Sequence, residues 1–126
     1  MKPSTVMLCC VLYCCPLAAQ AELIDIAWDA SGGFAQQRDV PAGKFVEVCG
    51  KLAAGLKVQW TFEATAAIDF NIHFHAGKDV IYPAKRAQVS TGHDTLHVKT
   101  AQDYCWMWTN KTAAVARLKM SLQRSE

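Results

Sequence analysis

Two histidines at alternate positions are the side chains of this sequence best placed to do chemistry. His73 and His75 lie in the segment Ile68–His75, in which apolar and polar residues alternate. Residues i and i+2 of a β-strand project from one face about 7 Å apart, and Asp69 and Asn71 extend the same polar stripe. These four side chains form the candidate binding face. The alternative interpretation is an ordinary solvent-facing stripe on a strand whose other face is core.

The histidine pair also suggests a metal site. Imidazoles with a nearby thioether suit copper, and imidazoles with a carboxylate suit zinc. His97 and Met107 are the further candidate ligands for His73 and His75. No Cys-x-x-Cys or His-Glu-x-x-His spacing supports a dedicated site. A blue-copper site would use Cys105 with a methionine, but no histidine follows that cysteine in the sequence.

Catalytic patterns are poorly represented. The sequence contains no Gly-x-Ser-x-Gly, no phosphate-binding glycine loop and no evident nucleophile beside a base. Asp69 near His73 and His75 could form an acid–base pair, although carboxylate–histidine contacts on strands are common without catalysis. We therefore expect a protein that is not an enzyme and that has no catalytic residue and no resident cofactor.

Three tryptophans are candidates for stacking on sugar rings, which would make the protein a carbohydrate-binding module. Trp60 alternates with polar residues in step with Val58 and Phe62, and Trp106 and Trp108 alternate in the same way. This alternation is the pattern of a strand with one face in the core. We expect all three tryptophans to pack in the interior, with one of the later two reaching the surface.

The first 21 residues have the pattern of a cleaved signal peptide. Lys2 provides a basic start, Val6–Leu17 is a compact apolar run, and Ala19-Gln20-Ala21 supplies the small residues of a cleavage site. The apolar run is shorter than the roughly 20 residues of a membrane span. We expect residues 22–126 to form one exported domain, periplasmic or secreted, without a membrane span after cleavage.

Four of the six cysteines lie in this leader. Cys14 or Cys15 could carry a lipid anchor, although Tyr13 is bulky where a small residue is required. The two remaining cysteines, Cys49 and Cys105, most simply form a disulfide in an oxidising compartment, and closing a loop of this size would stabilise the fold by roughly 4 kcal/mol. The alternative is two buried free thiols.

The charge balance excludes some partners. The chain has 13 Lys and Arg against 11 Asp and Glu, and Lys2 leaves with the signal peptide. This near-neutral balance gives no indication of nucleic acid or of an anionic membrane surface. Asn110-Lys111-Thr112 is a glycosylation acceptor sequence, and it matters only in a eukaryotic secretory pathway.

Alternation and turn residues predict an all-β fold, a two-layer antiparallel sandwich of about seven or eight strands. The segment Ala84–Thr91 lacks a clear pattern and is predicted as a loop. The expected strands are Leu23–Trp28, Phe34–Val40, Lys44–Cys49, Leu56–Glu63, Ile68–His75, Asp79–Tyr82, Thr95–Thr100, Tyr104–Thr109 and Ala113–Leu122.

Several of these strands, taken in order, resemble the Golgi-dynamics (GOLD) domain, the lumenal β-sandwich of early-secretory-pathway cargo receptors. The resemblance covers roughly Phe45–Leu122 and implies a binding or protein-interaction role. One departure is that the second cysteine of the family would fall at Met107, whereas here it is Cys105. The matching segments are Val46–Cys49, Gly55–Phe62, Asp69–Ile72, Gly77–Tyr82, Tyr104–Asn110 and Val115–Leu122.

These patterns together favour an exported, non-catalytic module of GOLD-like fold that binds a protein or a small ligand. A periplasmic copper or zinc protein using His73 and His75 is the first alternative. A carbohydrate-binding module is the second. The binding surface is expected on the polar face of Ile68–His75 and the adjacent loops, and we expect the two histidines to be dispensable for folding.

Overall fold

The computed structural model describes residues 21–126, so the expected signal peptide lies outside the described residues except for Ala21. Within this range the chain forms strands joined by short turns, and no helix there has the length and hydropathy needed to span a bilayer. The strands are β1 (Glu22–Asp25), β2 (Gly33–Val40), β3 (Phe45–Leu52), β4 (Lys57–Ala76), β5 (Asp79–His97), β6 (Gln102–Thr109) and β7 (Ala116–Ser125).

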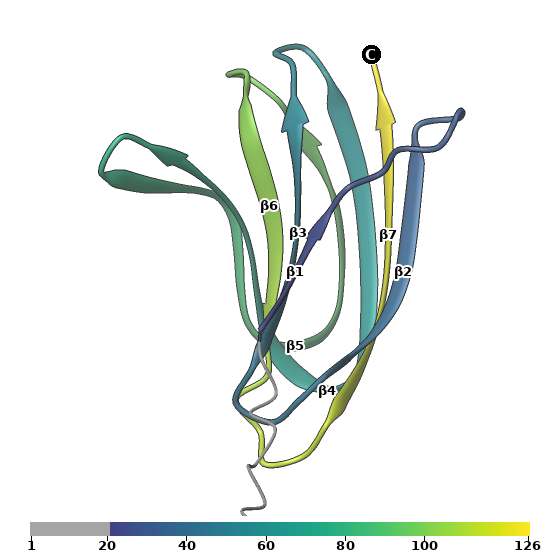
Figure 1. Ribbon diagram of the computed structural model, residues 1–126, viewed down its shortest axis with the longest axis vertical. Helices are drawn as coiled ribbons and strands as arrows, with labels where there is room; N and C mark the ends of the chain where they lie inside the picture. The colour runs from purple at the N-terminus through teal and green to yellow at the C-terminus, as the bar shows by residue number, and fades with distance from the viewer. Residues whose placement is uncertain (1–20) are drawn as a thin grey trace, which may run out of the picture.

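The strands form two layers that share β4 and β5 (Figure 1). One layer has the order β1-β3-β6 and continues into the second half of β4. The other has the order β2-β7 and continues into the first half of β4. β5 pairs antiparallel with β4 along both halves and thus belongs to both layers. The all-β sandwich expected from the sequence is confirmed, with β1 as an exception because it pairs parallel with β3.

Two sequence-based boundaries were wrong for one reason. Leu56–Glu63 and Ile68–His75 are halves of the single strand β4, and Ala84–Thr91 belongs to β5 rather than to a loop. The pairing of β4 with β5 shifts register between Glu63 and Ile68, where the chain passes from one layer to the other. Bulges disrupt apolar alternation locally but not the hydrogen-bonded ladder, so the sequence pattern suggested a break.

The bend in β5 is held by Asp69. Gln88 has a φ of 52°, a left-handed conformation that residues other than glycine seldom adopt. Its backbone N–H donates to Asp69 Oδ1 over 3.0 Å, and its side-chain Nε2 donates to the same oxygen over 2.9 Å. Asp69 was predicted as part of a binding face. In the structure it stabilises a strained residue at the point where β5 changes layer.

The core lies between the layers and is rich in aromatic residues. Trp60, Trp106 and Trp108 are all at most 2% exposed, which confirms their expected burial and leaves neither of the later two at the surface. The rings of Phe62 and Phe70 pack 4.8 Å apart, with Trp108 against both. These tryptophans therefore cannot stack on a sugar in the folded protein.

The turn between β6 and β7 is built around Asn110, which is fully buried. Its Nδ2 donates to Val40 O and Ala114 O over 2.9 and 2.7 Å. Its Oδ1 accepts from the backbone N–H and the hydroxyl of Thr112 over 2.9 and 2.7 Å. A glycan on Nδ2 would be incompatible with these hydrogen bonds, so in the folded protein the acceptor sequence serves the turn.

We predict that Asn110→Ala lowers the free energy of unfolding by about 2–4 kcal/mol, because it leaves buried polar groups without partners. Thr112→Val removes only the hydroxyl contacts of the same turn, and we expect it to cost about 1 kcal/mol. Urea denaturation of both variants measures the difference. Equal effects would mean that the amide contacts to Val40 and Ala114 contribute little.

A second prediction concerns Gly92, which lies beneath an aromatic ring. A Cβ at this position would lie 2.5 Å from Cε1 of Phe62 and 3.2 Å from Cζ3 of Trp60. We expect Gly92→Ala to destabilise the protein by about 1–3 kcal/mol through overpacking. In the background Phe62→Leu the same change should cost less, because the crowded ring is gone. A double-mutant cycle showing additive effects would exclude this steric origin.

Candidate functional site

Strand register brings the candidate site together on the outer face of the β1-β3-β6-β4 layer. Glu47, Met107 and Asn71 are successive partners across β3, β6 and β4. In the next row Cys49, Cys105 and His73 are partners in the same way. Directly paired residues on adjacent strands point to the same face of a sheet. Residues from three strands that are distant in the sequence therefore surround one histidine.

The second row is fixed covalently. Cys49 and Cys105 form a disulfide, with Cα atoms 4.1 Å apart on neighbouring strands. This is the pairing expected from the sequence, and the displacement of the second cysteine relative to the GOLD pattern does not prevent it. Cys105 pairs with His73 in the ladder. The disulfide therefore joins β3, which carries Glu47, to β6, the strand that pairs with His73.

His73 is buried, contrary to the prediction that both histidines face solvent. The residue is only 6% exposed, although it lies outside the central core. Its Nε2 is 3.0 Å from Glu47 Oε1, and its Nδ1 is 2.7 Å from Asn71 Oδ1. The alternation of β4 correctly indicated the outer face, but it could not indicate that neighbouring side chains cover that face. His75, two residues further on, is exposed as expected.

Burial lowers the pKa of His73 below its ordinary value of 6.5. The carboxylate of Glu47 acts in the opposite direction, and the nearby charge of His75 lowers the pKa further. Removing an imidazolium from water is costly, which makes the neutral ring the favoured form. A neutral ring with its proton on Nε2 donates a hydrogen bond to Glu47. In this form the other ring nitrogen, Nδ1, can only accept a hydrogen bond. The Asn71 amide must then be turned so that its NH2 group, rather than Oδ1, lies against Nδ1.

Tyr82 and Lys85 of β5 complete the cluster. The ring of Tyr82 lies 6.0 Å from that of His73, and the ring of His75 lies 5.5 Å from His73 on another side. Lys85 Nζ lies 4.4 Å from the centre of the Tyr82 ring, a cation–π contact. The name His73 cluster is used below for Glu47, Asn71, His73, His75, Tyr82 and Lys85.

Asp69 belongs to a different part of the face. Its Oδ2 is 2.7 Å from Lys111 Nζ, and its Oδ1 accepts from Gln88. The hydrogen bond from Lys111, followed by the one from the Gln88 backbone, lowers the pKa of Asp69. The predicted acid–base pair of Asp69 with His73 or His75 is therefore not formed, since the carboxylate that contacts His73 is Glu47.

Of the four suggested metal ligands, His97 lies apart from the others. His97 pairs with Lys57 at the far end of β4 from His73 and His75, whereas Met107 pairs with Asn71. Among residues 21–126, Glu47, His73 and Cys105 offer ligand atoms within 4.8 Å of one another. The sulfur of Cys105 is committed to the disulfide, and both nitrogens of His73 already have polar partners. In this group that leaves Glu47 and His73, which already contact each other.

The sequence alone did not indicate that Glu47, Tyr82 and Lys85 belong to the site. Glu47 sits between Val46 and Val48, so alternation could have assigned it to an outer face. Nothing in the sequence could have paired that face with His73, because the pairing passes through β6. Tyr82 was taken as the end of a short strand limited by Pro83, whereas β5 continues beyond it.

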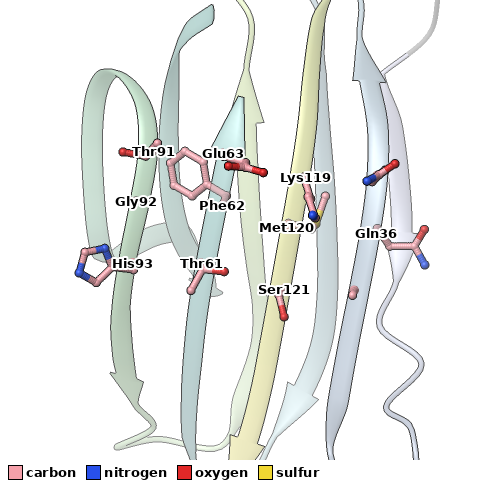
Figure 2. A pocket seen from close by; sticks show the side chains of 12 residues that line it. Gln36, Thr61, Phe62, Glu63, Thr91, Gly92, His93, Lys119, Met120 and Ser121 are labelled. Carbon is pink, nitrogen blue, oxygen red and sulfur yellow. The ribbon is translucent and has the colours of Figure 1, made fainter. Parts of the chain in front are cut away.

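A broad depression lies on the outer face of the other layer, across β2, β7, β4 and β5 (Figure 2). Its volume is about 700 Å³, and it is wide and open. Thr61, Glu63, Lys119 and Ser121 line it from paired positions on β4 and β7. Such alternating polar residues are typical of the solvated face of a sheet. It contains no buried polar group comparable with His73.

The fold and the cluster thus define a β-sandwich with an organised outer face. No known family matches the chain by sequence, and no curated protein does. Solved structures resemble it in fold. PliG of Aeromonas hydrophila, a periplasmic inhibitor of g-type lysozyme, has a TM-score of 0.64 and 9% identity, covering 84% of this chain and 98% of its own.

Two further structures extend this likeness. PliG of Salmonella Typhimurium has a TM-score of 0.61 and 9% identity, covering 83% of this chain and all of its own. The pre-peptidase C-terminal domain of a Bacillus anthracis collagenase has a TM-score of 0.60 and 10% identity, covering 82% of this chain and 95% of its own. At these identities the likeness establishes the fold alone.

We predict that His73 makes the protein less stable as the pH falls. The unfolded chain, with the histidine near its ordinary pKa of 6.5, binds a proton before the folded chain does. The free energy of unfolding should therefore decrease below about pH 6.5. Urea denaturation at pH 7.5 and pH 5.5 should show a smaller decrease for His73→Gln than for the unmodified protein.

His97→Gln is the matched control, because it removes a histidine at the far end of β4. We expect its pH dependence to follow that of the unmodified protein. An unchanged slope in His73→Gln would mean that His73 binds its proton equally well in the folded and unfolded states. The burial of His73 is tested at pH 7.5. We expect His73→Ala to lower the free energy of unfolding and His75→Ala to leave it nearly unchanged.

Proposed function

We propose that this protein is an exported, non-catalytic binding module that recognises a protein partner. The binding surface would be the end of the β4–β5 hairpin together with the adjoining His73 cluster. The observation that carries the proposal is the row of exposed apolar side chains on this hairpin. Its partner-binding role also agrees with what the resemblance to the GOLD domain implies.

The hairpin projects away from the two layers as the loop at the left of Figure 1. Val80, Ile81 and Tyr82 follow one another near its end and are 37%, 43% and 45% exposed. Because successive strand residues alternate in direction, Val80 and Tyr82 project from the face of His75 and His73, whereas Ile81 projects from the opposite face with Phe74. The hairpin therefore exposes apolar side chains on both of its faces, and such gathered exposure is typical of interaction sites. The turn itself is polar, with Lys78 and Asp79 exposed, and the apolar side chains follow directly behind it. Such a projection suits insertion into a concave surface of a folded partner.

Tyr82 is the expected anchor of this surface. Its ring is held between the amine of Lys85 and the buried imidazole of His73, and His73 is held in turn by Glu47. A tyrosine fixed before binding loses little conformational entropy on association. Tyrosine is also enriched among residues that dominate binding energy. The cluster therefore supports the hairpin as a positioning device rather than as a catalytic centre.

Export is supported by the disulfide, since such bonds persist mainly in oxidising compartments. The expected signal peptide agrees with this location. The structural neighbours add a specific partner to test, because two of them are described as periplasmic inhibitors of g-type lysozyme. A g-type lysozyme is a folded enzyme with which a projecting hairpin could interact, so we propose it as the first candidate partner.

The experiment is a calorimetric titration of a g-type lysozyme with the purified protein, accompanied by a lysozyme activity assay. We predict saturable binding that Tyr82→Ala weakens at least tenfold, the size of effect typical of an interface anchor. Val115→Ser is the matched control, because Val115 is an exposed apolar residue, at 56%, in the turn before β7. It should bind like the unmodified protein.

Two results would count against different parts of the proposal. Binding that is equally tight in Tyr82→Ala would exclude the hairpin as the interface. No heat of binding at 100 µM of each protein would exclude g-type lysozyme as the partner. Tyr82 and Val115 are both at the surface, so we expect both variants to fold. Thermal denaturation of each variant checks this.

A further inference from the structure

A second site lies at the open edge of the sandwich, where β5 passes from one layer to the other. The two halves of β5 flank a slot of about 420 Å³ that extends inward between the layers. Arg86 lies on the first half and Asp94 on the second, and their side chains approach to 3.5 Å across the slot. The slot is separate from the His73 cluster because it lies on the core side of β4.

The inner wall of the slot is apolar and aromatic. Trp60 and Leu96 contribute from one layer, and Ile72, Phe74 and Tyr104 contribute from the other. The Tyr104 hydroxyl donates to Thr100 O over 2.8 Å, so its polar atom is satisfied and its ring packs 5.0 Å from that of Phe74. Trp60, Ile72, Leu96 and Tyr104 are at most 6% exposed and form the floor of the slot. Its accessible apolar surface belongs to Phe74, Ile81 and Pro83.

The outer part of the slot is basic. Arg86, His97 and Lys99 line it beside a single acid, Asp94. The Arg86–Asp94 contact is long at 3.5 Å, and the two side chains are 42% and 61% exposed. Such an exposed pair contributes little to stability. The Arg86 guanidinium can therefore exchange Asp94 for the anionic group of a ligand. Lys99 would be a second cation beside that group.

We propose that this slot binds a small amphipathic anion, with the apolar body against Phe74, Ile81 and Pro83 and the acidic group at Arg86 and Lys99. The volume lies within the range of about 300–1,000 Å³ that is usual for small-molecule pockets, which combine apolar walls with a few polar groups. A carboxylate or sulfonate fits a guanidinium through paired hydrogen bonds. The charges at the rim, Arg86 and Lys99 beside Asp94, favour an anion over a cation.

The proposal is tested by calorimetric titration of the purified protein with decanoate. Two other ligands have a similar tail and a different head: decanol has no charge, and decyltrimethylammonium has the opposite charge. We expect decanoate to bind in a one-to-one ratio, decanol to bind about tenfold more weakly, and the cation to show no binding. Tryptophan fluorescence provides a second readout, because Trp60 lines the slot.

Variants assign the binding to the slot. Arg86→Gln should weaken decanoate binding about tenfold, the loss expected for one charge-assisted hydrogen bond, and should leave decanol binding unchanged. Lys85→Gln is the matched control: Lys85 precedes Arg86 on β5, carries the same charge, and contacts Tyr82 on the outer face. It should leave decanoate binding unchanged.

Three results would overturn the proposal. The first is no saturable decanoate binding at 1 mM. The second is equal affinity for decanoate and decyltrimethylammonium, which would indicate non-specific apolar adsorption. The third is an equal loss in Arg86→Gln and Lys85→Gln, which would place the anion on the general surface. The outcome is independent of the lysozyme experiment, since Tyr82→Ala leaves the lining of the slot intact.

Discussion

The pairing of β4 with both layers is the constraint on which the rest of the structure depends. Its first half bonds to β7 and its second half to β6, while β5 follows it along both. Backbone groups in a buried strand must find partners, so where β4 changes layer, β5 must bend with it. Asp69 stabilises that bend, because its carboxylate accepts a hydrogen bond from Gln88 in a left-handed conformation. One continuous strand thus fixes the separation of the layers, the position of the hairpin and the width of the slot.

The outer face of this sheet is more ordered than a solvated polar stripe requires. A disulfide joins β3 to β6, and the contact between Glu47 and His73 joins β3 to β4 across the same strand. The neutral form of His73 suits this position, because an imidazolium would be costly at such burial. Since the ring of Tyr82 lies beside that of His73, these links between three strands extend to a residue near the end of the projecting hairpin.

The two proposed binding surfaces use opposite sides of β5. In these proposals Val80 and Tyr82 face a folded partner on the outer side, whereas Phe74, Ile81 and Arg86 face a small anion in the slot. Structures that resemble this one include lysozyme inhibitors and a domain of a collagenase, which shows that the sandwich accommodates unrelated roles. The function of this chain must therefore be argued from its own residues.

The sequence by itself determined the all-β class, the burial of the three tryptophans, the outward face of β4 and the partner of Cys49. Each depends on alternation or on cysteine count, which are local or compositional properties. Only the tertiary structure decided that β4 is continuous through its bulge and that His73 is covered while His75 is not. It also decided that Glu47 rather than Asp69 contacts His73, and that His97 lies far from the pair. The physical reason is that alternation specifies which face a side chain occupies, whereas its neighbours on that face come from strands brought together by long-range pairing.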